Sequence, residues 1–529
     1  MQRNDSARSF IINFIVPSIV FGFVTGTLTA LVVNLYKLCA KHVIEVSEMG
    51  YEYLRGHLYF LPLVILALFG ISLLFAFIYK KIPNIKGGGI PTSIAILRDL
   101  VTFKWLRNLL GVFVMSLVTF LIGVPLGNEG PAVQMGTSIG RGSVYILARR
   151  HTAWDRYSMT GGACSGFYVA TGAPISGILF AIEEAHQRIS PTIMIVASSS
   201  VVFSSIANQI FAPWLGVSTQ LFDVAPMSAL ELKQLWVPLV VGLAIGIFGV
   251  LLLNYYKLLS KFFSKRLAGV KPQYKIFAIL TVTVIMGLVS FSNVSTGHEL
   301  IHQIFAGSVP ITLLILVLIV RSTLTLSANK NGITGGMFIP TLALGAIVAS
   351  IVGKIVLSLG GGEELYGIII ILGITATMSG VMKTPLTAIV FAIEALSCYE
   401  NILAIVIVAI LSYFVTELFE TTSINDTAME GKIEELNRGK EAKIVKEQVE
   451  VMAGAFAVGK QIRDIFWPAN LFVLSVKKAS AKSQEVDGHG GKLLHAGDIL
   501  QIQYSTNDEN ETKRVIEAIV GKQKPKAGE

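Results

Sequence analysis

Three glutamates stand within otherwise apolar stretches of this chain, where their carboxylates could carry protons. Glu129 lies in the apolar stretch 120–136, and Glu183 and Glu184 follow the run Ile178–Ile182. A carboxylate in such a setting is costly and therefore functional by default. At the start of a helix, Glu129 would occupy the position of a bound anion, and its protonation would free that position. One residue could thereby couple proton and anion movement or gate a pore; the alternative is a plain helix-capping acid.

The segment around Glu129 recurs about 210 residues later. Gly127–Gly136 and Gly336–Gly345 both read G-x-x-x-P-x-x-x-x-G. A second shared block follows each copy, Pro174–Glu183 in the first and Pro385–Glu394 in the second, with prolines 43 or 45 residues after those of the first block. This constant order predicts an internal duplication. In transporters built from two related halves, the substrate site commonly lies where the halves meet, near interrupted helices.

The duplication separates the roles of the two neighbouring glutamates. Glu183 has a counterpart in Glu394, whereas Glu184 corresponds to Ala395. A glutamate kept in both copies indicates a structural role, so Glu184 is the better candidate for passing protons. The alternative for Glu184 is an exposed helix end.

Three glycine-proline turns could supply an anion site. They are Gly87–Pro91, Gly127–Pro131 and Gly336–Pro340. Proline suits the first helical turn, and glycine lets the preceding backbone turn tightly. Helix N-termini carry unpaired N–H groups and about half a positive charge each, so several aimed at one point would bind an anion. The alternative is that these residues only pack or kink membrane helices.

The elements that would position these residues are membrane helices. The chain has 529 residues, of which 53% are hydrophobic and 15% charged. Several apolar runs are long enough to cross a bilayer, which takes about 20 helical residues. We predict an all-α multi-pass membrane protein with two related halves at about 10–213 and 234–418. Short half-helices are expected at Pro91–Asp99, Pro131–Leu147, Gly172–Ile182, Pro340–Val356 and Pro385–Leu396.

The character of the chain changes near its end. Residues 431–448 read as a charged linker, and 449–522 as a small α/β domain with strands at Leu471–Val476 and Ile499–Tyr504 and a helix at Glu511–Val520. This part resembles the C-terminal domain of RCK/TrkA-type potassium transport regulators. The resemblance rests on Val458-Gly459-Lys460, Pro468 and Leu494 leading into Gly497–Leu500. It implies a cytoplasmic regulatory domain with a small-molecule or ion ligand; a domain without a ligand is the alternative.

Residues 10–430 resemble the CLC family of chloride channels and proton-coupled anion exchangers. The motifs G-x-G-I-P, G-x-E-G-P and G-x-F-x-P, written above as the three turns, carry the resemblance. It implies that the two halves are inverted repeats with broken half-helices, and that the protein forms homodimers in which each subunit has its own pathway. By this match Glu129 is the gating glutamate, Glu184 is the inner proton glutamate, and Met337 and Phe338 give backbone amides to the anion.

The chain departs from the family pattern at three positions. Gly88 stands where the family usually has serine, and Asn128 where it usually has arginine. The family's central tyrosine should fall near residues 423–426, where Asn425 is the candidate replacement. These departures put chloride selectivity in doubt. Asn128 also resembles the fluoride/proton exchangers of the family, so fluoride/proton exchange and a passive anion channel remain alternatives.

A competing interpretation comes from His298-Glu299-Leu300-Ile301-His302, which fits the H-E-x-x-H pattern of a zinc protease. A catalytic zinc site normally takes three protein ligands, and no third ligand has recognisable spacing. The protease would also leave the duplication unexplained. A cation transporter is disfavoured because the signals lie at helix N-termini. We therefore expect a transporter in the cell membrane that is not an enzyme and has no metal ion or cofactor.

The expected partners are chloride or a similar small anion, protons, the lipid bilayer and a second copy of the chain. The net charge of +9 is assigned to cytoplasmic loops such as Lys257–Lys275, which sets topology, and not to a nucleic-acid partner. The gating and proton residues are Glu129 and Glu184. The anion path is predicted to include Gly88, Gly89, Ile90, Gly127, Asn128, Gly130, Met337, Phe338 and Asn425.

Overall fold

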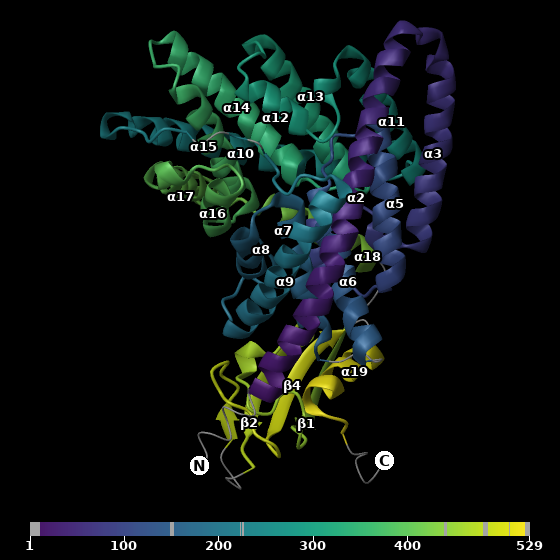
Figure 1. Cartoon of the computed structure of the whole chain (residues 1–529). Helices are drawn as coiled ribbons and strands as arrows, with labels where there is room; N and C mark the ends of the chain where they lie inside the picture. Colours follow the sequence, from purple (N-terminus) through teal and green to yellow (C-terminus); the bar gives the residue numbers. More distant parts are fainter. Residues whose placement is uncertain are drawn as a thin grey trace.

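The architecture comes from a computed structural model, and Figure 1 shows a tall helical unit above a small sheet domain. The structure describes residues 11–148, 153–222, 224, 227–437, 442–479, 485–506 and 508–523. The helical unit contains both halves of the duplication. The sheet domain follows it in sequence.

The first half runs from the long helix α2 to α9, whose end lies close to the predicted boundary at 213. α2 extends over the full height of the helical unit (Figure 1). The elements are η1 Ile11–Ile15, α2 Val16–Gly56, η2 Leu58–Phe60, α3 Leu61–Lys81, η3 Pro83–Ile85, α4 Ile90–Leu97, α5 Trp105–Ile122, α6 Glu129–Ala148, α7 Asp155–Thr171, α8 Pro174–Phe180, η4 Ala181–Ala185 and α9 Pro191–Leu215.

The second half repeats this arrangement and ends with α17 at the predicted boundary of 418. A further helix, α18, then leads toward the sheet domain. The elements are η5 Leu232–Gln234, α10 Trp236–Lys261, η6 Phe262–Arg266, α11 Pro272–Val289, η7 Phe291–Asn293, α12 His298–Phe305, α13 Ile311–Lys330, α14 Phe338–Ser358, α15 Leu365–Met382, α16 Pro385–Glu394, η8 Tyr399–Asn401, α17 Ile402–Leu418 and α18 Ile424–Asn437.

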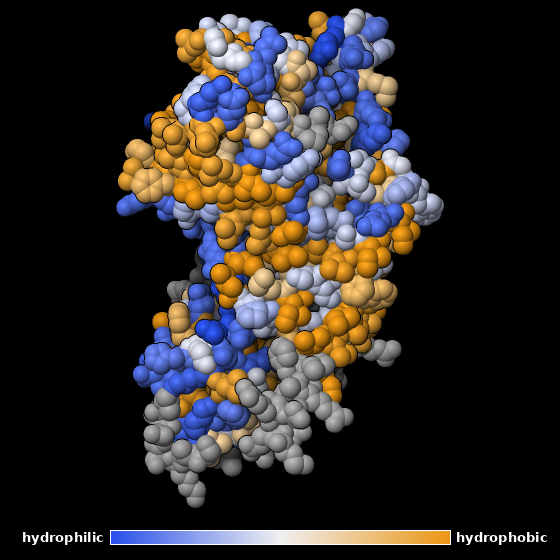
Figure 2. Space-filling model, turned by 60° about the vertical axis from the view of Figure 1, so that its left-hand side comes forward, coloured by the Kyte–Doolittle hydropathy of each residue, from blue (hydrophilic) through white to orange (hydrophobic). Residues whose placement is uncertain are grey.

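The helical unit has the surface of a membrane protein. Within the described residues, 10 helices are long and apolar enough to cross a membrane. Large apolar side chains such as Leu63, Leu66 and Phe414 are more than half exposed. Figure 2 shows apolar side chains gathered in a broad band between more polar ends. Lipid is the environment that accommodates such a band, and the predicted multi-pass helical fold is confirmed.

The predicted half-helices are of two kinds. α4, α8 and α16 are short, with 8, 7 and 10 residues. α6 and α14 are longer, with 20 and 21 residues, and each begins and ends within two residues of the predicted segments 131–147 and 340–356. Both begin among buried residues, as expected for helix N-termini that lie inside the membrane unit.

The C-terminal region forms one antiparallel sheet with strand order β1-β4-β2-β3. The predicted strands and helix appear as β2 Leu471–Lys477, β4 Ile499–Thr506 and α19 Glu509–Val520, and β3 is Glu485–Asp487. β1 is Lys443–Glu450, so the sheet begins inside the segment predicted as a charged linker, and α18 takes the linker's first part. Residues 438–441 of that linker lie outside the described residues. β1 was missed because only one of its faces is apolar, and its lysines and glutamates dominate the composition.

The turn before β4 is held by a buried carboxylate. Asp498 accepts hydrogen bonds from Lys478 Nζ at 2.7 Å and from the backbone N–H groups of His495 and Ala479. Burial alone would raise the pKa of Asp498, but the Lys478 ammonium and these amides together hold it below its ordinary value. Asp498 therefore stabilises the predicted turn at 495–498, and both of its carboxylate oxygens accept hydrogen bonds from groups of the same domain.

The sheet domain docks on one end of the membrane unit. Tyr157 at the start of α7 donates to the backbone oxygen of Asp464 at 2.6 Å, and Arg156 donates to that of Trp467 at 2.5 Å. The ring of Phe466 lies 4.4 Å from that of Tyr157 and 4.6 Å from that of His186. The docking surface thus reaches the residue that follows η4.

Candidate functional site

The two copies of the repeated motif meet at the centre of the membrane unit. Gly127 N donates to Gly336 O at 2.7 Å, and Gly336 N donates to Gly127 O at 2.8 Å. This antiparallel bridge joins equivalent residues of the two halves. The contact is so close that a Cβ added to Gly130 would lie 2.6 Å from Gly336 Cα. Glycine is required because no larger residue allows the backbones to approach this closely.

The helices that begin on either side of this bridge point unpaired amides at the junction. The first backbone bonds are Ala132 N to Asn128 O in α6 and Thr341 N to Met337 O in α14, each 3.0 Å. The N–H groups before them have no acceptor within their own helix, and the prolines have no N–H at all. These amides belong to Glu129, Gly130, Phe338 and Ile339, and no backbone acceptor for them is found among the described residues. The arrangement suits an anion.

Glu129 is the acidic residue at this junction, and its side chain is fully buried. Neither oxygen of its carboxylate has a hydrogen-bond partner among the described residues. The side chain folds back along the bridge, because a Cβ added to Gly127 would lie 2.5 Å from Glu129 Oε2. His298 Nε2 lies 3.4 Å from Glu129 Oε1, at ion-pair distance. A buried carboxylate without hydrogen-bond partners is costly, so this placement is expected at a functional site and not at a purely structural one.

The N-terminus of α4 reaches the same junction, with one difference from expectation. A Cβ added to Gly89 would lie 3.0 Å from Gly130 Cα, and Gly89 has a φ of 109°. Gly89 N donates to Gln134 Oε1 at 2.5 Å, so its amide is already satisfied. A Cβ added to Gly88 would lie 2.7 Å from the same oxygen. Gln134 therefore occupies the space beside Gly88, where a serine side chain would have to fit.

Gln134 is a site residue that the sequence reasoning missed. It is fully buried, and its Nε2 donates to Asn84 O at 3.0 Å and Asn108 Oδ1 at 3.1 Å. Its side chain thus joins α4, α5 and α6. The available signal was a polar amide in a helix whose neighbouring residues are small or apolar, which is a functional indication inside a membrane.

Glu184 and Asn425, predicted separately, are in direct contact. Asn425 Nδ2 at the start of α18 donates to Glu184 Oε1, and both residues are buried. Arg98 donates to the backbone oxygens of Glu184 and Ala185, each at 2.9 Å, and pairs with Asp426 at 3.1 Å. The carboxylate therefore lies among polar groups on the side of the membrane unit nearest the sheet domain.

The structural role predicted for Glu183 and Glu394 is confirmed. Glu183 accepts from Leu386 N at 2.9 Å and Thr387 N at 2.6 Å, at the start of α16. Glu394 accepts from Ile175 N at 2.8 Å and Ser176 N at 2.9 Å, at the start of α8. Each half thus caps a helix of the other half. Carboxylates suit this place because helix N-termini carry partial positive charge.

The two residues predicted to bring amides from the second half are buried and lie at the start of α14. Phe338 packs edge-on against Phe167 at 5.3 Å and against Phe391 at 5.6 Å. Met337 is the residue before the helix. The aromatic cluster fixes the end of α14 with apolar contacts, so the backbone amides are the polar groups that this helix presents at the junction.

The His298–His302 motif forms α12, as a short helix between α11 and α13. Among the described residues, no group of three or more histidine, cysteine, aspartate or glutamate side chains is placed to hold a metal ion. His298 contacts Glu129 instead. That contact was missed, because nothing in the sequence brings residues 129 and 298 together.

Comparison with known proteins agrees with this geometry. The family model described as voltage gated chloride channel matches residues 71–417. A relative from Klebsiella pneumoniae, the H⁺/Cl⁻ exchange transporter ClcA, is 29% identical over 417 residues, covering 77% of this chain and 87% of the relative.

Two solved structures share the fold of the membrane unit. A slow cyanobacterial Cl⁻/H⁺ antiporter matches with a TM-score of 0.71 and 23% identity, covering 79% of this chain and 99% of that one. A CLC-type fluoride/proton antiporter matches with a TM-score of 0.61 and 21% identity, covering 76% of this chain and 96% of that one. The family match spans well over half of the sequence and contains both halves of the site. The chain therefore belongs to the CLC family of voltage-gated chloride channels and related antiporters.

Proposed function

We propose that this protein exchanges chloride, or a similar small anion, for protons across the membrane. The observation that carries the proposal is the position of Glu129 at the junction of two helix N-termini, where its buried carboxylate accepts no hydrogen bond from the described residues. Free amides at such a junction favour negative charge, whether it comes from a bound anion or from the carboxylate itself. The two therefore compete for one position.

This competition couples the two fluxes. When Glu129 is ionised, its carboxylate takes the place of the anion; when Glu129 is protonated, the neutral side chain loses its attraction to the amides and an anion can bind. Each cycle then moves a proton on Glu129 against an anion at the junction. Glu184, held by Asn425, is proposed to exchange protons with the side that faces the sheet domain. The relatives named as H⁺/Cl⁻ exchangers support this assignment.

The anion path offers few side-chain groups that would select one small anion over another. The path lacks a serine hydroxyl at Gly88, and the Gly89 amide is occupied by Gln134. Anion binding then depends on the backbone N–H groups of α6 and α14, which can donate hydrogen bonds to any small anion that fits between them. Fluoride is the second candidate, because Asn128 precedes the glutamate and a fluoride/proton antiporter shares the fold.

We further propose that the sheet domain lies in the cytoplasm, in a homodimer of the kind the family resemblance implies. The basic loop between α10 and α11 lies beside α18, since Ser260, Pro272, Gly431 and Lys432 line one cavity of about 490 Å³. Positive loops favour the cytoplasmic side, and α18 leads directly into the sheet domain. A TrkA-C-like ligand-binding role for this domain remains part of the proposal. Cross-linking in native membranes and labelling of the sheet domain in inside-out vesicles test both points.

The decisive experiment is anion flux in liposomes containing the purified protein while the internal pH is recorded. Chloride, fluoride and nitrate gradients are supplied in turn. We expect a chloride gradient to drive proton movement in wild-type protein. The Glu129→Gln variant should still move chloride but should no longer move protons. A passive channel would show anion flux without a pH change in the wild type, and proton coupling that survives in Glu129→Gln would contradict the role of Glu129.

A further inference from the structure

His298 is the residue of the H-E-x-x-H motif that the proposed function has not used. Its Nε2 lies 3.4 Å from Oε1 of the buried Glu129 carboxylate, and its own side chain is 28% exposed. His298 therefore links the fully buried Glu129 carboxylate to the solvent-accessible surface. The contact is not aligned as a hydrogen bond, so either side chain must turn slightly before a proton can pass.

The imidazole is held in this position by several neighbours. Thr296 Oγ1 lies 3.1 Å from its Nδ1, and the ring of Phe222 lies 6.2 Å away. Gly297, with a φ of 105°, forms the N-cap of α12. Arg321, fully buried, donates to three carbonyl oxygens of the preceding loop, those of Ser292, Val294 and Ser295. Such bracing keeps Nε2 directed at Glu129.

The charged and titratable groups around the imidazole come from four helices. Glu129 faces it from α6, and Arg321 of α13 lies behind Gly297, where a Cβ would be 2.7 Å from its Nη2. Lys37 of α2 interacts electrostatically with Glu129 and donates to the backbone oxygens of Val169 and Ser218. Glu299 and His302 follow on α12 itself. Lysine and arginine remain charged near neutral pH, whereas imidazole changes its charge between about pH 5 and 8.

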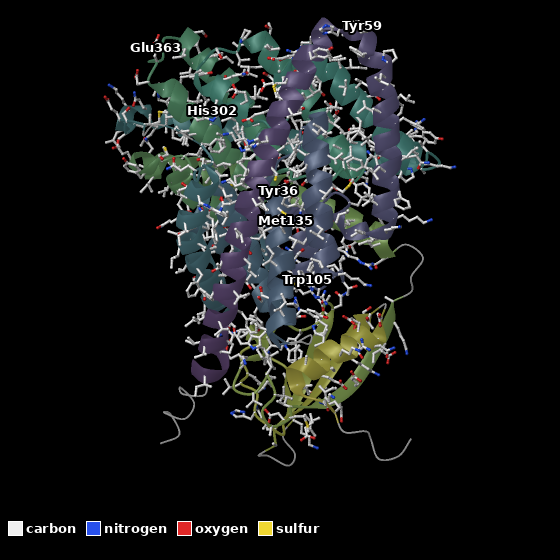
Figure 3. The ribbon with its side chains drawn as sticks, turned by 45° about the vertical axis from the view of Figure 1, so that its right-hand side comes forward. Tyr36, Tyr59, Trp105, Met135, His302 and Glu363 are labelled. Carbon is white, nitrogen blue, oxygen red and sulfur yellow. The ribbon has the colours of Figure 1, made fainter. Side chains whose placement is uncertain are left out.

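The position of α12 indicates on which side of the membrane unit His298 could exchange protons with water. α12 lies at the end of the membrane unit away from the sheet domain (Figure 1), and Figure 3 shows His302, one turn along α12, at the same end. Glu184 lies toward the opposite end, beside Arg98 and Asp426. Glu129 thus has a candidate proton partner on the outer side that is separate from the inner glutamate.

We propose that His298 relays protons between Glu129 and the water on the side opposite the sheet domain. In the inward direction, the Nε2–H bond of the imidazolium breaks, an O–H bond forms on the Glu129 carboxylate, and the neutral imidazole then takes a proton from outer water. In the outward direction the same steps run in reverse. This inference rests on the proposed function, because a relay has meaning only if Glu129 exchanges protons.

The test is coupled proton flux in liposomes for His298→Gln and His298→Ala across a pH series from about 5.5 to 8.5. General acid–base groups typically contribute 10² to 10⁴ in rate, so we expect proton flux to fall at least about tenfold. If an imidazole carries the proton, the wild-type flux should depend on pH across this series, and that part of the dependence should be lost in both variants. Adding imidazole to the outer solution should restore flux in His298→Ala. His302→Gln, an exposed histidine one turn away, is the matched control and should keep the wild-type profile.

The outcomes separate the relay from the proposed function. If wild-type protein moves chloride without protons, the exchange itself fails. If wild-type protein is coupled but both His298 variants keep its proton flux and pH profile, the relay is wrong. If proton and anion flux fall together and imidazole restores neither, His298 is only structural and the relay is again wrong. Elution of each variant as a single peak in size-exclusion chromatography confirms folding.

Discussion

The two halves of the membrane unit share a backbone design but carry different side chains at equivalent positions. Gly127 and Gly336 bond to each other, and both are followed by a helix whose free amides face the junction. The first half places Glu129 there and the second half places Phe338. Likewise, Glu184 of the first half corresponds to Ala395 of the second. The duplicated backbone supplies the anion site, while proton chemistry belongs to the first half alone.

Alanine substitutions at the two bridging glycines, Gly127 and Gly336, should show the largest difference between the two halves. A Cβ at Gly336 would lie 2.7 Å from Gly130 N, which is backbone and cannot yield, so Gly336→Ala should cost about 3 kcal/mol or more and reduce folded protein. At Gly127 the nearest atom is the Glu129 carboxylate, which can move, so Gly127→Ala should fold and instead alter proton coupling.

Thermal unfolding in detergent and liposome flux measure these two effects. Gly70→Ala is the control, since a Cβ there meets nothing within 4 Å. Equal instability of Gly127→Ala and Gly336→Ala would show that the bridge is symmetric in its packing, contrary to the geometry described.

Removing the charge of Glu184 should show whether proton transfer depends on the first half alone. Glu184→Gln keeps the size of the side chain and its contact with Asn425, so the fold should be retained. Without an ionisable group at this position, proton flux should fall at least about tenfold while anion flux persists. Simultaneous recording of both fluxes is the measurement. An unchanged ratio of protons to anions would remove Glu184 from the proton path.

The crossed caps are the contacts in which Glu183 caps α16 and Glu394 caps α8. Because the two contacts are equivalent, removing either charge should have the same effect on stability. Glu183→Gln leaves the amides of Leu386 and Thr387 with a weaker acceptor, and Glu394→Gln does the same for Ile175 and Ser176. Each should lower stability by about 1–2 kcal/mol, the usual cost of losing a charged cap, without changing the ratio of protons to anions. Unfolding midpoints in detergent and flux ratios decide this. A changed ratio in Glu183→Gln would mean that its neighbour is not the only proton carrier at this end.

Substituting Gln134 should give the smallest effect of these comparisons between the halves. Gln134 lies three residues after Pro131, and the equivalent position in the second half, three residues after Pro340, is Ala343. Both of its N–H groups are bonded to protein oxygens, so it has no hydrogen left for an anion. Gln134→Met should release the Gly89 amide and tighten anion binding several-fold, at about 1 kcal/mol of stability. Calorimetric titration with chloride measures the change. Weaker binding would indicate that Gln134 supports the site in another way.

The sequence was most informative where duplication or a motif constrained it. Two ordered blocks predicted two halves, their meeting point and a structural role for Glu183 and Glu394. It was least informative where function depends on contacts between distant segments. Gln134 beside Gly88, Asn425 on Glu184 and His298 near Glu129 join residues that no periodicity relates. The bounds of α6 and α14 were predicted to within two residues, because proline and glycine mark their starts.

The crossed caps have a consequence for how the chain is made. During synthesis, Ser176 leaves the ribosome 218 residues before Glu394, whose carboxylate accepts its amide. The first half therefore completes α8 only after nearly all of the membrane unit has been translated. Neither half, expressed as a fragment, contains the glutamate that caps its own short helix, so we expect co-expression of the two halves to stabilise each of them.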